Sequence, residues 1–278
     1  MKARLWGTRG SQASPGPDTA RYGGNTSCVQ VEADDSSVLI LDAGTGIRRL
    51  GTVVPPDVER VDILLTHLHV DHIQGLGFFA PLRQPGLEVH IWGPGSTTMG
   101  LQARLTRYLS PPLFPVRLVD LDCDLYLHET GFEPFEVPGA TVTADRVCHA
   151  GPTVGYRIES DGRVLTYISD HEPRLGSHDF PNDPEWMSGY RLAHRADVLI
   201  HDAQYNEVEY QERKGWGHST LVDAVRFATA CEVESVVLFH HDPAHDDETL
   251  DHLVDEARAA ASPDLDVQVA HEDDVLSI

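Results

Sequence analysis

Four potential metal ligands, His67, His69, Asp71 and His72, stand within six positions of the chain. They directly follow an apolar run, residues 61–66, that has the composition of a buried strand. Imidazole nitrogens and carboxylate oxygens gathered at a strand end suit zinc, and manganese or iron could also use them. His67 and His69 can project to the same side of an extended chain, whereas the adjacent pair that follows cannot both do so. The cluster therefore predicts a pair of metal ions better than a single ion.

The composition is that of a globular protein. The 278 residues are enough to bury a sizeable core, and 41% of them are apolar. No apolar run approaches the length of a membrane span, and the first residues enter a strand-like stretch without a signal-peptide core. The four cysteines are scattered with no Cys-x-x-Cys pair, which argues against a disulfide framework or a zinc ribbon. We expect a single domain over residues 1–278, cytoplasmic and without a membrane partner.

The charge of the chain is strongly acidic. Its 21 basic and 44 acidic residues give a formal net charge of −23. Such a field repels nucleic acid over most of the surface, so we expect no general nucleic-acid binding. A local positive metal site could still attract one phosphodiester. Solubility in a salty cytoplasm, or a compositional bias, is the simpler interpretation of the charge.

Strand-like and helix-like segments alternate along the chain. Strands are expected at residues 2–6, 28–32, 38–42, 61–66, 88–92, 132–137, 141–148, 153–159, 164–169, 198–201, 235–239 and 266–270. Helices are expected at residues 96–109, 221–231 and 246–261. Two strand-rich halves, each with helices, imply an α/β protein in which two sheets pack together with helices outside.

Three other predicted strands also end in a residue that can bind a metal. His149 follows residues 141–148, Asp170 follows residues 164–169, and His240 follows residues 235–239. Each of these alone would more often be an ordinary loop residue. Together with the first cluster they make seven potential ligands at four strand ends, and such ends can converge on one edge of a sheet.

These motifs resemble the metallo-β-lactamase superfamily, whose signature is His-x-His-x-Asp-His, and in particular its ribonuclease Z and cyclic phosphodiesterase branch. The resemblance implies a four-layer αββα sandwich. The segments that carry it are Gly-Thr-Arg-Gly-Ser at 7–11, Leu-Asp-Ala-Gly-Thr-Gly at 41–46, the cluster at 67–72, Ile-His-Asp-Ala at 200–203, Gly-His-Ser-Thr at 217–220 and Leu-Phe-His at 238–240. They span nearly the whole chain.

The resemblance also implies a set of ligands for two divalent metal ions, with zinc expected and manganese or iron as alternatives. One metal would be held by His67, His69 and His149. The other would be held by Asp71, His72 and His240, and Asp170 would bridge both. His241 is the rival of His240, which matches better because it comes directly after the apolar strand. Asp42 matches an aspartate that supports the ligand histidines, although a turn residue before Gly44 is an equal reading.

Two metal ions can share a hydroxide and bind an anionic phosphoryl oxygen. A further group is then needed to protonate the departing alkoxide. His218 is the candidate acid, with Asp202 orienting it or raising its pKa. Asp71 is counted with this pair as a catalytic residue. The competing interpretation of His218 is a bystander next to Ser219, which could cap the following helix.

The resemblance to ribonuclease Z breaks down at one point. That enzyme carries a long arm between its third histidine and its bridging aspartate, with which it grips tRNA. Here only 21 positions separate His149 from Asp170, enough for the two predicted strands alone. We therefore expect a small anionic substrate, such as a cyclic phosphodiester, rather than tRNA 3′ processing.

Other interpretations remain open at this stage. A hydrolase of a lactone, thioester or lactam would share the metal cluster, but the Gly-His-Ser-Thr segment is not expected of it. A tRNA 3′-processing endonuclease would need the missing arm. A metal-bound sensor or interaction protein would keep the fold without catalysis. Arg9 could lie near the substrate or in a surface ion pair. A homodimer is implied by the resemblance alone.

Overall fold

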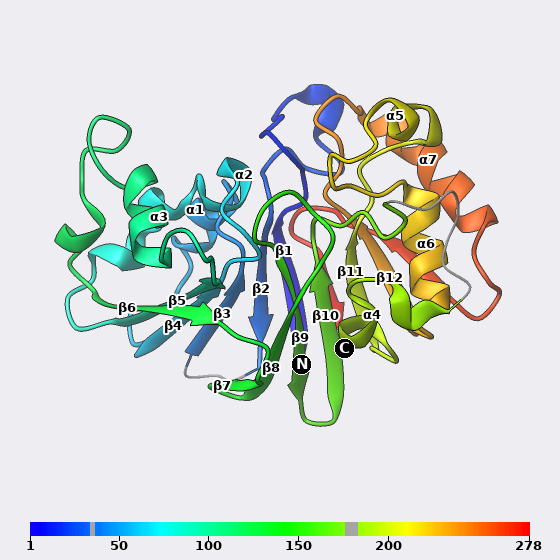
Figure 1. Cartoon of the computed structure of the whole chain (residues 1–278). Helices are drawn as coiled ribbons and strands as arrows, with labels where there is room; N and C mark the ends of the chain where they lie inside the picture. The colour runs from blue at the N-terminus through cyan, green and yellow to red at the C-terminus, as the bar shows by residue number, and fades with distance from the viewer. Residues whose placement is uncertain (34–36, 176–182) are drawn as a thin grey trace.

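The computed structural model describes residues 1–33, 37–175 and 183–278, and it contains two mixed β-sheets of seven strands each (Figure 1). The first sheet has the order β14-β1-β2-β3-β4-β5-β6. Its strands are β1 (Lys2–Gly7), β2 (Cys28–Glu32), β3 (Ser37–Leu41), β4 (Arg60–Leu64), β5 (Glu88–Pro94), β6 (Asp124–Thr130) and β14 (Val275–Ser277). The second sheet has the order β13-β12-β11-β10-β9-β8-β7. Its strands are β7 (Phe135–Val137), β8 (Ala140–Arg146), β9 (Val154–Ser160), β10 (Arg163–Ile168), β11 (Val198–Asp202), β12 (Ser235–Phe239) and β13 (Asp266–Val269).

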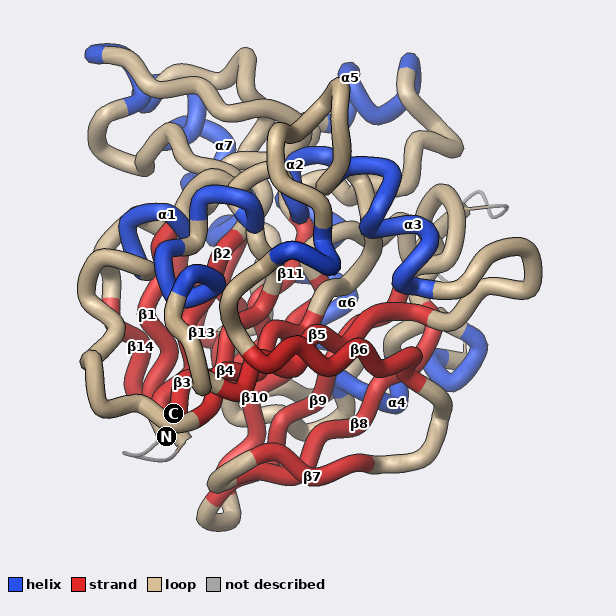
Figure 2. Tube along the Cα trace, turned by 90° about the vertical axis from the view of Figure 1, so that its left-hand side faces the viewer, coloured by secondary structure: helices blue, strands red, loops and turns tan. Residues whose placement is uncertain are grey.

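Helices cover the outer faces of both sheets, as Figure 1 shows. On the side of the first sheet lie α1 (Ile47–Leu50), α2 (Val70–Ile73) and α3 (Leu101–Tyr108). On the side of the second sheet lie α4 (Tyr190–Ala193), α5 (Glu207–Glu212), α6 (Leu221–Ala230) and α7 (Asp247–Ala259). Figure 2 shows both chain termini at one end of the strands, with α2 and α5 at the opposite end.

Three separate apolar cores produce a four-layer structure. Alternate residues of a strand point to opposite faces of a sheet, so one strand can serve two cores. In β3, Val38 and Ile40 contact the core beneath α1 and α3, whereas Leu39 and Leu41 enter the core between the two sheets. A third core lies between the second sheet and helices α6 and α7. The predicted αββα sandwich is confirmed.

The sequence prediction missed two strands and lengthened one helix. β6 and β14 are the two edge strands of the first sheet, and edge strands are half-solvated, so their apolar pattern is weak. The helix expected at residues 96–109 begins only at Leu101, because Gly100 before it has extended backbone. Among the described residues, no helix is long and apolar enough to cross a membrane.

Candidate metal centre

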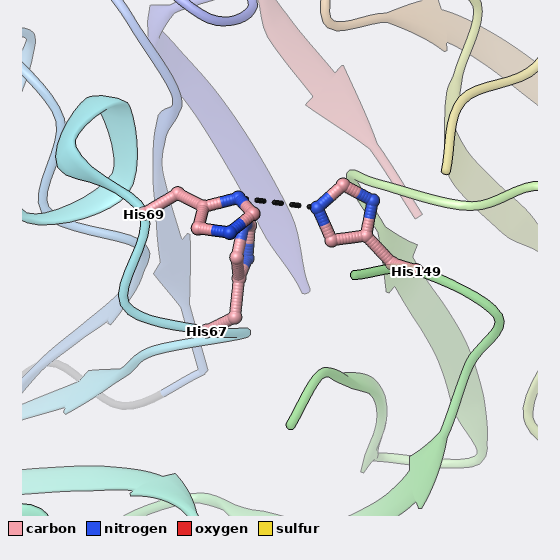
Figure 3. Close-up of side chains that lie close together, drawn as sticks. All are labelled: His67, His69 and His149. Carbon is pink, nitrogen blue, oxygen red and sulfur yellow. Dashed lines mark hydrogen bonds between the residues drawn. The ribbon is translucent and has the colours of Figure 1, made fainter. Parts of the chain in front are cut away.

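Three histidines from two loops lie close together at the ends of strands from both sheets. His67 and His69 follow β4, His149 follows β8, and one ring nitrogen of each lies within 4.8 Å of the others. His69 Nδ1 and His149 Nε2 are 3.2 Å apart (Figure 3). His69 is exposed while His67 is buried, so this group of three lies nearer to solvent. Three convergent imidazoles are a donor set suited to a divalent metal.

A second group is formed by Asp71, His72, Asp170 and His240, all of them buried. The chain turns at His69, which is extended and precedes the short helix α2. This turn brings Asp71 and His72 to His240, although the ring of His72 still lies beside that of His67, with centroids 4.2 Å apart. His72 Nε2 lies 3.1 Å from Asp71 Oδ2, and His240 Nε2 lies 3.3 Å from the same oxygen.

Asp170 reaches both groups. Its Oδ1 lies 3.8 Å from Nε2 of His67 and 3.8 Å from Nε2 of His149. On the other side, Oδ1 lies 3.5 Å from His240 Nε2 and Oδ2 lies 3.2 Å from His72 Nε2. This position, between the two groups, is the one required of a bridging carboxylate.

His241 points away from the centre, unlike its neighbour. Its Nε2 donates to the carbonyl oxygen of Ala270 at 2.9 Å, and its ring packs edge-on against Tyr22. His240 has left-handed backbone, with φ of 63°. A non-glycine residue in this region costs of order 1–3 kcal/mol, a strain often found at functional sites. Of the two rivals, only His240 lies in the cluster.

The donor atoms of the cluster fit a metal. Within the described part of the chain, His67 Nε2, His72 Nε2 and Asp170 Oδ2 are buried without a hydrogen-bond partner. Burial, followed by the nearby His72, holds the pKa of His67 well below its usual range. Burial also lowers the pKa of His69 and of His149. These three rings are therefore neutral at physiological pH, the form that binds a metal.

In the second group the neighbouring carboxylates raise the pKa of a histidine instead of leaving it lowered by burial. Burial lowers the pKa of His72, but Asp170, Asp71 and Asp42 outweigh it and raise that pKa well above its usual range. Burial opposes ionisation of Asp170, but His240, His72 and His67 hold its pKa well below the usual range. The carboxylates thus demand positive charge, which a divalent ion would supply in place of the His72 proton.

Asp42 joins both sheets beneath the centre. It is fully buried and follows β3 with left-handed backbone, φ 58°. Its carboxylate accepts hydrogen bonds from the Thr66 backbone N–H at 2.8 Å and from the Thr66 hydroxyl. It also accepts from His72 Nδ1 at 2.8 Å and from the Tyr167 hydroxyl at 2.9 Å. Asp42 therefore orients His72 and is not merely a turn residue.

Replacing Asp42 by alanine is expected to lower the free energy of unfolding by about 3–5 kcal/mol, the usual cost of breaking a buried charged pair. The substitution leaves four donors from Thr66, His72 and Tyr167 without their acceptor. Urea denaturation of the metal-free protein measures the change. A loss below about 1 kcal/mol would show that Asp42 does not hold these elements together, and Asp264→Asn, an exposed site, serves as the control.

The predicted acid pair is also formed. Asp202 ends β11, and its Oδ2 lies 2.7 Å from His218 Nδ1. Burial lowers the pKa of His218, but Asp202 outweighs this effect and raises it above the usual value. One atom each of Asp202 and His218 lies within 4.8 Å of atoms of Asp170 and His240. Thr220, rather than Ser219, caps helix α6.

A buried glutamate that the sequence analysis missed fixes the loop before His218. Glu172 accepts backbone N–H hydrogen bonds from Gly215 and Gly217 and a hydrogen bond from the Tyr210 hydroxyl at 3.0 Å. The carbonyl oxygen of Gly217 in turn lies 2.7 Å from His149 Nδ1. The one signal in the sequence was the place of Glu172, two positions after Asp170.

Arg9 is not at the surface, and it forms no ion pair with any residue that the structure describes. It is fully buried, and its guanidinium donates to three backbone carbonyl oxygens, those of Gly23, Asp242 and His245. These contacts tie the segment after β1 to the segment after β12. The Gly10 N–H adds a further link between the two segments, since it donates to the carbonyl oxygen of His241. The surface ion pair is therefore wrong for Arg9, and the contacts of its side chain hold the loop that carries Ser11.

Comparison with known proteins agrees with this architecture. Residues 38–241 match the family described as "Beta-lactamase superfamily domain". A curated ribonuclease Z from Streptococcus suis is 27% identical over 290 residues, covering 87% of this chain and 90% of that protein. The crystal structure of Zn(2+)-bound PqqB from Methylobacterium extorquens has a TM-score of 0.73, is 19% identical and covers all of both chains. A diphosphatase from the PhnP family has a TM-score of 0.67, is 19% identical, and is matched over all of this chain and 97% of its own.

These matches confirm the resemblance on which the expected fold rested. The match of residues 38–241 covers well over half of the chain, and the relatives include proteins named ribonuclease Z. The chain belongs to the beta-lactamase superfamily, a superfamily of metal-dependent hydrolases, and resembles its ribonuclease Z and PhnP branch.

Proposed function

We propose that the protein is a dinuclear metal-dependent phosphodiesterase that cleaves a small, cyclic phosphodiester. The observation that carries this proposal is the His218–Asp202 pair, 2.7 Å apart, beside the metal-ligand cluster. A protonated histidine held by a carboxylate is suited to giving a proton to a leaving alkoxide. Expulsion of an alkoxide is the demanding step in cleaving a phosphodiester of a sugar.

The seven clustered side chains have distinct roles in this proposal. His67, His69 and His149 would hold one ion; Asp71, His72 and His240 would hold the other; and Asp170 would contact both. When bound, two divalent ions, which we expect to be zinc, supply a hydroxide near neutral pH and positive charge for the phosphoryl oxygen. Asp71 is proposed to contribute to catalysis as a ligand, through the charge it adds to the second site.

Asp202 and His218 complete the reaction. Asp202 occupies His218 Nδ1, so Nε2 is the ring nitrogen left to deliver a proton. The P–O bond to the leaving oxygen breaks as hydroxide adds to phosphorus, and His218 gives its Nε2 proton to that oxygen. Asp202 keeps the His218 ring in one orientation, because its other oxygen is itself held by hydrogen bonds from the backbone N–H groups of Gln204 and Ser219 at 3.1 Å each.

The segment between His149 and Asp170 supports a small substrate. Residues 149–170, all described by the structure, form the antiparallel hairpin of β9 and β10, with Arg163 paired to Ser160. A hairpin of this length leaves no room for an RNA-gripping arm. The name ribonuclease Z of the Streptococcus suis relative points to RNA as a substrate of that protein, which argues for an RNA substrate instead. The net charge of −23 favours the small substrate.

The test is hydrolysis by purified protein loaded with zinc or manganese. We expect cleavage of bis(p-nitrophenyl) phosphate and of at least one cyclic nucleotide or cyclic ribose phosphate, and loss of both activities in His69→Ala. A lactone panel, a thioester and a precursor tRNA are assayed beside them. Metal-loaded protein that is inert toward every phosphodiester but turns over a lactone would overturn the proposal in favour of the alternative hydrolase.

A further inference from the structure

Four of the clustered histidines keep Nδ1 against a protein oxygen, which leaves Nε2 for the metal centre. The Nδ1 partners are Thr66 Oγ1 for His67 at 3.1 Å, Asp42 Oδ2 for His72 at 2.8 Å, Gly217 O for His149 at 2.7 Å and Gln204 Oε1 for His240 at 3.1 Å. A carboxylate and a carbonyl can only accept, so they place the proton on Nδ1. Thr66 also acts as an acceptor, because its hydroxyl hydrogen is directed to Asp42.

Gln204 differs from the other three Nδ1 partners, because an amide side chain has a donor end and an acceptor end. With its NH₂ toward His240, the amide would favour the opposite tautomer and put the proton on Nε2, where the metal must bind. The side chain of Gln204 is buried, so water does not set its orientation. The end of the amide that faces His240 must therefore be fixed by a hydrogen bond with another residue.

Asp242 fixes the orientation of the Gln204 amide. Its Oδ2 lies 3.4 Å from Gln204 Nε2, and a carboxylate oxygen can accept but not donate. The NH₂ end must therefore face Asp242, which turns Oε1 toward His240. The second N–H of the amide donates to Ser11 Oγ at 3.1 Å, and the Ser11 backbone N–H donates to Asp71 Oδ2 at 2.8 Å. The same amide thus also steadies the loop that holds Asp71.

We propose that Gln204 is a positioning residue that, oriented by Asp242, selects the metal-binding tautomer of His240 and so sets the affinity of the second metal site. The proposal rests on the metal centre of the proposed function, but not on its substrate. Partners of this kind usually change metal affinity 10- to 100-fold when they are removed.

The first test is Gln204→Leu, measured by titrating the metal-free protein with Zn²⁺ against a chromophoric chelator. We expect the second ion to bind about 10- to 100-fold more weakly and the first ion to bind as in the unmodified protein. Gln30→Leu is the matched control, because Gln30 Oε1 accepts a ring N–H from Trp6, also at 3.1 Å, in strand β2. Full affinity for both ions in Gln204→Leu, or an equal loss at both sites, would overturn the proposal.

The second test is a rescue that a merely structural role would not produce. Gln204→Glu keeps an oxygen that accepts from His240 Nδ1 but sets a carboxylate against Asp242, so we expect it to weaken the second site through that repulsion, and by less than the leucine variant does. Adding Asp242→Asn restores one donor and one acceptor across this contact, and the double variant should recover most of the lost affinity. Failure of the double variant to recover would overturn the proposal. Two bound ions with no phosphodiester cleavage would instead count against the proposed function alone.

Discussion

Replacing Asp170 by asparagine is expected to lower turnover of bis(p-nitrophenyl) phosphate by at least about a thousandfold, the upper range for loss of one preorganised charge-stabilising group. Asp170 has oxygens near both groups of ligands, 3.8 Å from His67 and His149 and 3.2 Å from His72. Asparagine keeps the shape but removes the negative charge that the two proposed ions would share. Steady-state kinetics and elemental analysis for metal content measure the effect, and the metal content should fall below two ions per chain.

The matched control for this change is Asp62→Asn. Asp62 is as buried as Asp170, but it pairs with Arg60 at 2.7 Å and accepts the indole N–H of Trp92, with no histidine contact among its hydrogen bonds in the described residues. It should lose stability while keeping both ions and turnover. Equal metal content in the two variants would show that Asp170 is not a shared ligand.

The fold was predictable where strands are buried on both faces. β12 (Ser235–Phe239) is buried throughout and has the bounds expected from sequence, because an apolar run between polar residues marks such a strand directly. The edge strand β6 was missed because its side chains are only partly buried, so solvent allows polar residues at the positions that would show the alternation. Short helices such as α2 and α4 have four residues each, too few for a periodic pattern.

The candidate ligands were predictable because each follows an apolar strand, and the ends of these strands, which come from both sheets, meet at one end of the sandwich. The supporting residues could not be found in this way. Gln204 contacts His240 across 36 positions, and Glu172 contacts Gly217 across 45. Gln, Glu and Gly have ordinary roles at most positions, and only the packed structure shows which partner each one has. Arg9 illustrates the same limit, since burial decided its role.

Replacing Asp202 by asparagine is expected to move the alkaline limb of the pH–rate profile to lower pH and to lower kcat by about 10²- to 10⁴-fold, the usual contribution of general acid catalysis. Burial lowers the pKa of His218 and Asp202 raises it more, so the net shift is upward. An acid catalyst works only below its pKa, where it holds its proton. Removing the carboxylate lowers that pKa, and the active range then ends at a lower pH. The profile of kcat against pH on a cyclic nucleotide measures the shift.

The leaving group separates this role from a structural one. His218→Ala should lose most activity on a cyclic nucleotide, whose leaving alkoxide needs a proton, and little on bis(p-nitrophenyl) phosphate, whose nitrophenolate is stable as an anion. Damage to the metal centre would reduce both rates together, as in His69→Ala. Equal losses on the two substrates would therefore rule out His218 as the acid. Unequal losses, with the metal content unchanged, would assign the donated proton to His218, the ring that Asp202 holds at 2.7 Å.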